Sequence, residues 1–266
     1  MKVRVISALI VIGVFLPFLL IGGLPFALLM AALAVMCMYE LIKARESKKA
    51  FPKLLKIVAY IMVVLFTLMN FDSIKFQFDL DYRMVAAFIF IFLSPMVFIG
   101  DTKKYNINDA LFLIGSILFV GLSFNLMMIT RNYNVNYIIY LLLITTMTDT
   151  FAYATGLLIG KNKLCPNISP KKTIEGFVGG LVMGTFVAGA FYNTVINPMM
   201  PIVFVILFTA AFCAIAQLGD LVFSVIKRYY GIKDFSNVIP GHGGILDRFD
   251  SLIFVTLAFI MLVEFI

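Results

Sequence analysis

Two aspartates interrupt stretches of sequence that are otherwise apolar. Asp149 lies in the segment 145–150, and Asp220 follows Gln217, Leu218 and Gly219. A carboxylate inside a membrane is costly unless it is paired, hydrated or bound to a cation, so such residues are candidates for function by default. The alternative is a polar contact between helices, or an aspartate close enough to the membrane interface to be hydrated, and it carries more weight for Asp149 than for Asp220.

Asp220 shares a predicted helix face with other polar residues. Ser224 and Lys227 follow it at intervals of four and three residues, which places all three on one side of a helix, with Arg228 beside them. Such a stripe suits a polar cleft that opens towards the cytoplasm. Anchoring at the membrane interface is the alternative role for the two basic residues.

The segment after this helix is rich in glycine. Three glycines and a proline fall within Pro240–Gly244, where the backbone can adopt unusual conformations and a ligand can approach the main chain closely. Asp247 and Asp250 follow, three residues apart, at the expected start of the last helix. Acidic residues also suit a helix N-terminus, which is their alternative role.

The predicted loop 160–175 carries a second cluster of polar residues. Ser169 or Thr173 before a helix, with Glu175 nearby, resembles a capping arrangement. Lys171 and Lys172 stand beside the same helix N-terminus, where backbone N–H groups and the helix dipole favour phosphate. Carboxylates, lysines and a glycine-rich segment together indicate metal-assisted phosphoryl or nucleotidyl transfer, with Mg²⁺ as the expected cation.

The stretch from Ser224 to Asp250 resembles the long sequence pattern of bacterial phosphatidate cytidylyltransferases (CDP-diacylglycerol synthases). The Asp149 region, the Ser-Pro-Lys-Lys-Thr run ending at Thr173 and the Gly-Asp-Leu run around Asp220 resemble the family's other motifs. The resemblance implies a membrane enzyme that joins CTP and phosphatidic acid, giving CDP-diacylglycerol and pyrophosphate with help from a divalent cation.

The resemblance also assigns roles to residues. Asp220 and Asp247 would hold Mg²⁺, with Asp250 and Asp149 as further candidates and with room for a second cation. Asp220, Asp247 and Lys227 would be the catalytic residues. The substrate-binding residues would be Ser169, Lys171, Lys172, Thr173, Glu175, Ser224, Arg228, Lys233, His242, Gly243, Gly244 and Arg248. The chain departs from the family at Phe223, where an acidic residue is usual, and this leaves the number of cations open.

Composition indicates how these residues must be positioned. Of the 266 residues, 62% are hydrophobic and 13% are charged, whereas soluble domains carry about 45–50% apolar and about 25% charged residues. This excludes a soluble enzyme, a disordered chain and a disulfide scaffold. The apolar runs are continuous, not alternating, which favours helices over a transmembrane barrel. We therefore expect an all-α, polytopic integral membrane protein.

The apolar runs predict about nine transmembrane helices. The first run, Val3 to Ile42, is long enough for two spans with a turn at Gly22–Pro25. The remaining spans are predicted at 54–70, 84–100, 108–130, 137–159, 176–196, 201–226 and 249–266.

The basic residues predict the orientation of these spans. With the N-terminus in the cytoplasm, all but three of the 21 basic residues fall on the inner side; the exceptions are Lys75, Arg83 and Arg131. This agrees with the positive-inside rule and predicts an N-in, C-out protein of the inner cell membrane with a cytoplasmic active site. The charge of +7 then reflects topology and lipid headgroups, not nucleic acid.

Two regions are expected on functional grounds. Residues 1–144 form an N-terminal membrane region, and residues 145–266 form a catalytic region that carries the motifs. Gly176, Gly180, Gly184 and Ala188 recur every fourth residue, a small-residue face for close helix packing within the chain or in a homodimer.

Two other functions remain open from the residues alone. A transporter could use Asp149 and Asp220 to carry cations or protons. A related nucleotidyltransferase could act on another lipid phosphate, because apolar walls that bind lipid tails look alike in sequence.

Overall fold

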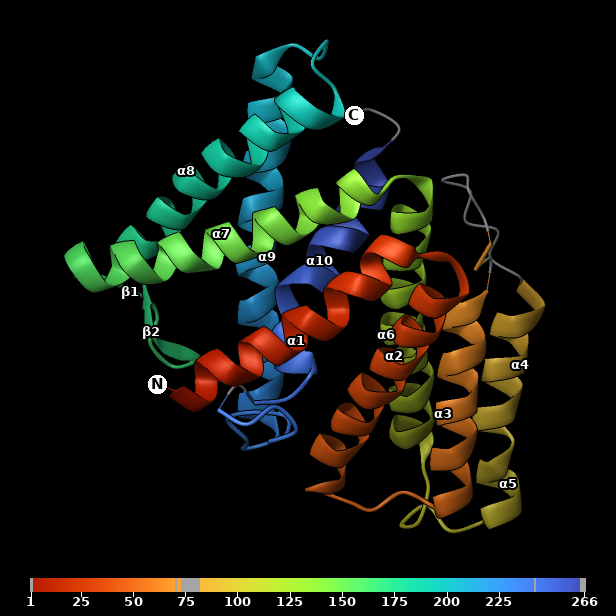
Figure 1. The fold of residues 1–266 in the computed structure, drawn as a ribbon. Helices are drawn as coiled ribbons and strands as arrows, with labels where there is room; N and C mark the ends of the chain where they lie inside the picture. The colour runs from red at the N-terminus through yellow and green to blue at the C-terminus, as the bar shows by residue number, and fades with distance from the viewer. Residues whose placement is uncertain (1, 70, 73–81, 242, 264–266) are drawn as a thin grey trace. The chain divides into compact units, whose positions relative to one another are not determined.

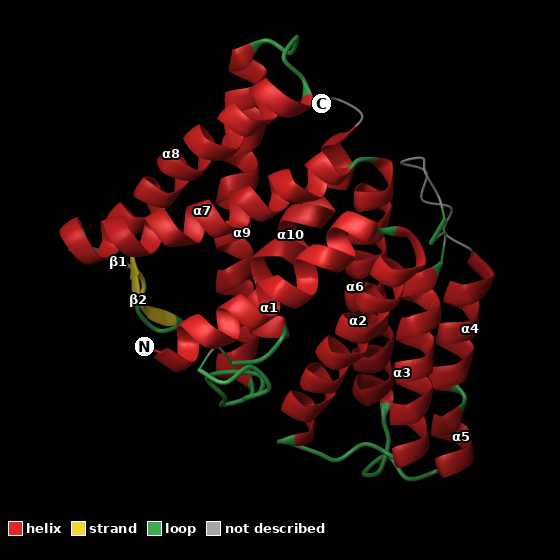
Figure 2. Ribbon diagram, viewed as in Figure 1, coloured by secondary structure: helices red, strands yellow, loops and turns green. Residues whose placement is uncertain are grey.

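The computed structural model describes residues 2–69, 71–72, 82–241 and 243–263 of the chain. This part is mostly helical, and a short two-stranded hairpin is the only sheet in it (Figure 2). The helices are α1 (Lys2–Ile21), α2 (Gly23–Glu46), α3 (Lys53–Leu68), α4 (Tyr82–Leu93), α5 (Pro95–Ile99), α6 (Ile107–Tyr133), α7 (Val135–Ile159), α8 (Ile174–Phe191), the π-helical turn η1 (Tyr192–Ile196), α9 (Ile202–Tyr229) and α10 (Leu246–Leu262).

Six helical segments are long and apolar enough to cross a membrane. They are Gly23–Glu46, Tyr82–Ile99, Ile107–Tyr133, Val135–Ile159, Ile174–Ile196 and Ile202–Tyr229. Each overlaps one of the nine predicted spans, so the predicted helical, multi-pass membrane class is confirmed. The count of nine and the N-in, C-out orientation stay predictions.

The chain forms two compact units. The first comprises Met1–Tyr133 with Asp234–Asp247, and the second comprises Asn134–Lys233 with Arg248–Ile266. Packing thus divides the chain at residue 133 and returns the segment 234–247 to the first unit. The division predicted at residue 144 concerns motifs and stays a prediction.

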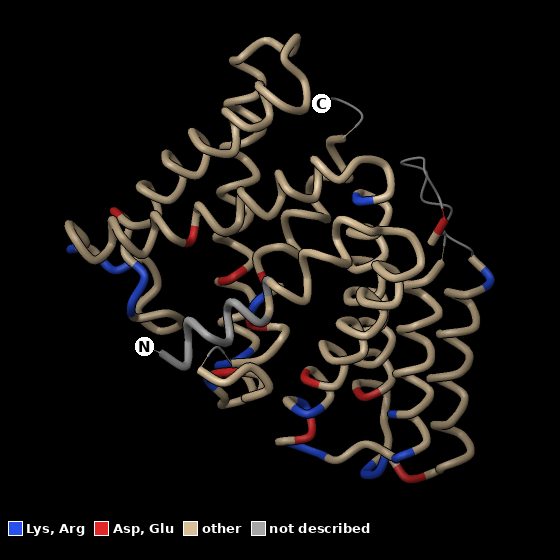
Figure 3. The backbone as a smooth tube through the Cα atoms, in the orientation of Figure 1, with Lys and Arg blue, Asp and Glu red and all other residues tan. Residues whose placement is uncertain are grey.

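In the first unit, α2, α3 and α6 lie side by side and α4 follows beyond α3 (Figure 1). The rings of Phe66 on α3 and Phe88 on α4 meet edge to face with their centroids 5.6 Å apart, and both are buried. Charged residues of this unit gather at helix ends (Figure 3). There, the buried Asp109 carboxylate accepts a hydrogen bond of 2.7 Å from Arg45.

In the second unit, α7 packs along α8, and α9 packs against both (Figure 1). The buried Tyr140 hydroxyl on α7 hydrogen-bonds to Thr209 on α9 at 2.8 Å. Phe259 joins α10 to this core, because its ring centroid lies 6.0 Å from that of Phe212. Gln217 on α9 donates to the backbone oxygen of Phe177 on α8.

The predicted loop 160–175 is more ordered than expected. It contains an antiparallel hairpin of β1 (Lys163–Cys165) and β2 (Ser169–Thr173), which runs directly into α8. Pro166 and Asn167 occupy the turn, a position that favours both residue types, and Ile168 N–H closes the turn on the Cys165 oxygen at 3.2 Å. The loop prediction was therefore wrong for these residues, since their backbone groups pair across the turn.

Candidate active site

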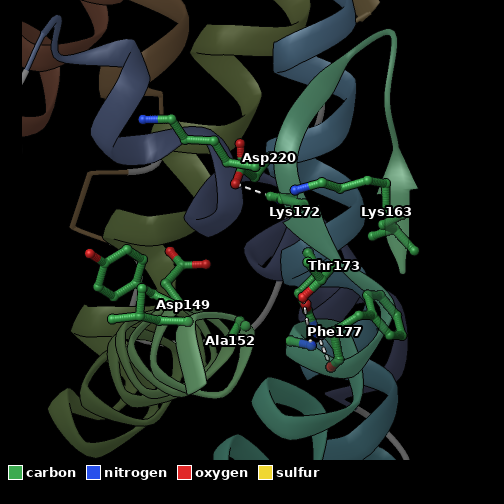
Figure 4. A pocket seen from close by; sticks show the side chains of 14 residues that line it. Asp149, Ala152, Lys163, Lys172, Thr173, Phe177 and Asp220 are labelled. Carbon is green, nitrogen blue, oxygen red and sulfur yellow. Dashed lines mark hydrogen bonds and ion pairs between the residues drawn. The ribbon is translucent and has the colours of Figure 1, made fainter. Parts of the chain in front are cut away.

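A pocket of about 510 Å³ lies within the second unit, between α7, the hairpin, the start of α8 and the middle of α9 (Figure 4). Its walls combine acidic, basic and small residues. The lining residues are Asp149, Ala152, Tyr153, Gly156, Leu157, Lys163, Leu164, Lys171, Lys172, Thr173, Gly176, Phe177, Gln217 and Asp220. The sequence predicted metal-binding, catalytic or substrate-binding roles for five of them, Asp149, Lys171, Lys172, Thr173 and Asp220, and a packing role for Gly176.

Asp220 and Lys172 form an ion pair in this pocket. The Lys172 ammonium lies 2.6 Å from Asp220 Oδ2, and their side chains are 25% and 28% exposed (Figure 4). The Ser224 hydroxyl, one turn further along α9, donates to Asp220 Oδ1 at 3.4 Å. Asp220 and Ser224 therefore lie on the same face of α9, as predicted. Lys172 reaches this face from β2.

Three carboxylates of the second unit influence one another electrostatically. Asp149 on α7 and Asp250 on α10 both experience repulsion from Asp220 on α9. Lys172 and Arg248 attract Asp149, while Lys227 attracts Asp250. Figure 4 shows the Asp149 side chain rising from α7 on the side of the pocket where Asp220 lies. Acidic and basic groups from four elements thus share one region.

The hairpin and α8 hold the lysines in place through local hydrogen bonds. Thr173 Oγ1 accepts from Gly176 N–H at 3.1 Å and caps α8, so the predicted capping arrangement is confirmed, with Thr173 as the capping residue. Glu175 accepts from the backbone N–H groups of Lys161 and Asn162 at 3.1 and 3.2 Å. These contacts tie the start of the hairpin to the start of α8.

Arg228 also contacts the hairpin. Its Nε donates to the Ile168 oxygen at 3.2 Å, and its Nη1 donates to the Ile232 oxygen at 3.1 Å. Lys233, which follows, is exposed. Ser169 begins β2 opposite Cys165 and stands outside the residues that line the pocket.

Glycines allow α7 and α8 to pack closely enough to form the pocket wall. Gly176, Gly180, Gly184 and Ala188 are all buried. A Cβ atom on Gly180 would lie 2.6 Å from the Thr148 backbone oxygen, and one on Gly176 would lie 2.7 Å from that of Ala152. The small-residue face therefore packs within the chain, against α7.

The remaining predicted residues belong to the first unit. Asp247 Oδ2 accepts from the backbone N–H groups of Phe235 and Gly244, each at 2.9 Å. Gly243 has φ +86°, a conformation that favours glycine, and its oxygen accepts from Ile239 N–H. His242 lies outside the described residues. The predicted pairing of Asp247 with Asp220, which belongs to the second unit, stays a prediction.

Comparisons with known proteins identify the family of the chain. A model of the cytidylyltransferase family matches residues 2–266. The chain belongs to this family. A phosphatidate cytidylyltransferase of Staphylococcus saprophyticus subsp. saprophyticus is 38% identical over 265 residues, which cover 96% of both chains. Phosphatidate cytidylyltransferases of Staphylococcus haemolyticus and Staphylococcus aureus are 38% and 39% identical over 256 residues, again covering 96% of both chains.

Phe223 is where this cytidylyltransferase departs from the expected acidic residue. Its side chain is fully buried, and its ring meets that of Phe254 on α10 edge to face at 6.1 Å. An apolar contact between α9 and α10 thus stands where a charge was expected. Asp149 and Asp220 line the pocket, and Asp250 experiences repulsion from both.

Among the described residues, sequence reasoning missed the buried carboxylates of Asp109 and Glu40, and Glu40 is the one that contacts a predicted site segment. Glu40 lies near the end of α2 with none of its surface exposed. It accepts hydrogen bonds from the segment 234–247 of the same unit. The rule that selected Asp149 and Asp220 could have found it, but Lys43 and Arg45 follow closely and make the region look like an ordinary membrane interface.

Proposed function

We propose that the protein transfers the cytidylyl group of CTP to phosphatidic acid in the pocket between α7, α9 and the hairpin. The products are CDP-diacylglycerol and pyrophosphate. The activity class rests on the family and on the printed names of relatives that match nearly the full length. The ion pair between Lys172 and Asp220 is the observation that supports this pocket as the active site. A lysine can bind phosphate and an aspartate can bind a cation, and here the two side chains are in contact.

The groups around the pocket fit a divalent cation. Among the described residues, no group of three or more Asp, Glu, His or Cys side chains is placed to hold a metal ion by itself. Mg²⁺ does not need such a cage, because it is commonly held by one or two carboxylates together with substrate phosphates and water. Asp220 is the proposed protein ligand, with Asp247 as its partner and Asp149 and Asp250 as further candidates. When bound, the cation would neutralise phosphate charge and polarise the phosphoryl group.

The hairpin lysines are proposed to bind the triphosphate. Lys171 and Lys172 both line the pocket, and charge-assisted hydrogen bonds to phosphate are stronger than neutral ones. Arg228 orients the hairpin through the Ile168 oxygen, and Lys227 and Arg248 add positive charge beside the carboxylates. These residues hold the phosphates in line and keep the acidic side chains from repelling them.

The nucleophile needs little activation. A phosphate monoester has its second pKa near 6, so phosphatidic acid presents an ionised oxygen at neutral pH. That oxygen attacks the α-phosphorus of CTP, a new P–O bond forms, and the bond to the β-phosphate breaks to release pyrophosphate. The protein's contribution is then positioning and charge neutralisation, which dominate phosphoryl transfer in general.

The location of the reaction is also a proposal. The bias of basic residues supports nine spans, an N-in, C-out orientation and a pocket on the cytoplasmic side of the cell membrane, where CTP is available.

An assay with purified protein tests the proposed function. The protein in detergent receives phosphatidic acid, labelled CTP and Mg²⁺, and labelled product is extracted into organic solvent. We expect a lipid-soluble labelled product that depends on both phosphatidic acid and Mg²⁺. Failure to form product with any lipid phosphate or divalent cation would contradict the proposed transfer and favour the alternative, a cation or proton transporter. Product with a different lipid phosphate alone would indicate the related nucleotidyltransferase.

A further inference from the structure

Glu40 holds the segment 234–247 from a helix more than 190 residues earlier in the chain. Its Oε1 accepts from the Ser236 hydroxyl at 2.5 Å and from Ile245 N–H at 2.9 Å, and its Oε2 accepts from Leu246 N–H at 2.8 Å. Glu40 is completely buried and Ser236 is nearly so. Burying a carboxylate is costly unless hydrogen bonds replace its lost hydration. The three donors therefore stabilise Glu40 in this position.

Two of these donors lie where α10 begins. The first N–H groups of a helix lack partners within the helix and must be satisfied by other groups. Glu40 supplies that partner for Ile245 and Leu246, and its negative charge suits the positive end of the helix dipole. Glu40 therefore caps α10 through tertiary structure.

Asp247 belongs to this segment and binds two of its backbone groups. Its Oδ2 binds the N–H groups of Phe235 and Gly244, which are the neighbours of the groups bound by Glu40. The two carboxylates thus fasten residues 235–236 to residues 244–246 by adjacent hydrogen bonds. Moving one carboxylate should therefore shift the other, because the two bind backbone groups only one residue apart.

Space around Glu40 is also tightly filled. A Cβ atom on Gly244 would lie 2.5 Å from Glu40 Oε1 and 2.6 Å from Oε2. Any side chain at this position would push against the carboxylate that caps the helix. Gly244 is therefore needed for close approach to Glu40, in addition to any contact with substrate.

We propose that Glu40 is a positioning residue for the reaction, which sets the place of Asp247 and of the glycine-rich segment. The proposal gives a role to the N-terminal region, and it rests on the proposed function of Asp247 as a cation ligand. Glutamine cannot replace Glu40 well. One amide oxygen can keep two of the three donors, but the amide nitrogen would then face the remaining donor.

Hydrogen–deuterium exchange and kinetics together test this role. In Glu40→Gln, we expect the amides of residues 244–246 to exchange about tenfold faster, because losing a buried hydrogen bond opens the segment. We also expect lower turnover and a higher Mg²⁺ requirement. Glu46→Gln is the matched control, since Glu46 on the same helix binds Phe51 N–H and Lys56 instead. It should leave both measurements unchanged.

Two milder variants test the same role if Glu40→Gln does not fold. Ser236→Ala removes one hydrogen bond to Glu40 and should raise exchange and the Mg²⁺ requirement by smaller factors, whereas Ser236→Thr keeps the hydroxyl and should restore both. Unchanged exchange at 244–246 in Glu40→Gln and Ser236→Ala would overturn the proposal. Faster exchange with unchanged kinetics would overturn it too, because Glu40 would then have only a structural role.

A parallel variant separates this proposal from the proposed function. Asp247→Asn should lower turnover if Asp247 binds the cation. Normal turnover in Asp247→Asn would contradict the cation role and with it the positioning role of Glu40. Reduced turnover in Asp247→Asn with normal exchange and kinetics in Glu40→Gln would contradict the role of Glu40 alone.

Discussion

Asp220 and Lys172 form an ion pair, whereas in the proposed reaction the aspartate binds a cation and the lysine binds phosphate. In the structure, the lysine neutralises the carboxylate at 2.6 Å. Phosphates would compete for the lysine, and a cation would compete for the carboxylate. The pair therefore keeps both charged groups in the pocket. In the proposed reaction, phosphate and cation together would replace this one favourable contact by two.

Asp220→Asn should separate activity from stability. The substitution keeps the shape but removes a cation ligand, so we expect turnover to fall on the order of 100-fold and the remaining activity to require more Mg²⁺. The melting temperature should change little, because partly exposed ion pairs contribute about 1 kcal/mol or less. Asp101→Asn, in an exposed turn of the first unit, is the control. Near-normal turnover in Asp220→Asn, measured beside its melting temperature, would refute the cation assignment.

Lys172→Ala should act mainly on the nucleotide. Charge-assisted hydrogen bonds to phosphate contribute roughly 1.5–3 kcal/mol, which corresponds to a rise in the KM for CTP or a fall in turnover of about 10- to 100-fold. The same direction is expected for Lys171→Ala. Lys104→Ala, in an exposed turn, provides the comparison. Unchanged CTP kinetics in a folded variant would leave that lysine with a topological role only.

At the scale of elements, close packing of α7 against α8 shapes one wall of the pocket. Asp149 comes from α7, while Lys172 comes from the hairpin that leads into α8. The glycines of α8 let its backbone approach Thr148 and Ala152 on α7. A helix pair in a membrane gains stability from such packing, since lipid offers no hydrophobic driving force for association.

Gly180→Ala should loosen this pair of helices. The new Cβ would meet the Thr148 backbone oxygen at 2.6 Å, and a backbone oxygen cannot move aside easily. We expect a destabilisation of about 1–3 kcal/mol and reduced turnover. Gly115→Ala on α6 is the matched control, because its Cβ would meet nothing within 4 Å. Equal melting temperatures and turnover for the two variants would contradict the packing argument.

At the scale of the whole molecule, charge predicts the orientation of the chain in the membrane. The basic residues fall mostly in segments predicted to face the cytoplasm, and the hairpin with Lys163, Lys171 and Lys172 is one of them. Cytoplasmic exposure of this hairpin is what the proposed use of CTP requires.

Cysteine labelling tests this orientation. Cys165 on β1 is partly exposed, whereas Cys37 and Cys213 are buried and are first replaced by alanine. In intact cells, a membrane-permeant thiol reagent should block Cys165 and an impermeant one should not. Met199→Cys in a Cys165→Ala background is the control, because residue 199 lies in a turn predicted to face outwards and is 92% exposed. Labelling of Cys165 by the impermeant reagent would contradict the N-in, C-out prediction.

Hydropathy and helical periodicity were sufficient for a large part of this description. The apolar runs predicted the helical membrane class and the positions of the six candidate spans, because the cost of exposing backbone and polar groups to lipid acts locally on each segment. The same cost singled out Asp149 and Asp220 as exceptions. A Ser or Thr cap at the start of α8 was predictable since capping is also a local interaction, and the structure identifies it as Thr173.

The partners of these residues were decided by tertiary structure. Nothing in the sequence near Asp220 indicates that Lys172 reaches it from a hairpin, or that Gly180 packs against Thr148. Glu40 resembled an ordinary interfacial residue until the fold brought Ser236, Ile245 and Leu246 to its carboxylate. Residue type and spacing determine which groups need a partner, whereas the packing of distant segments determines which partner satisfies them.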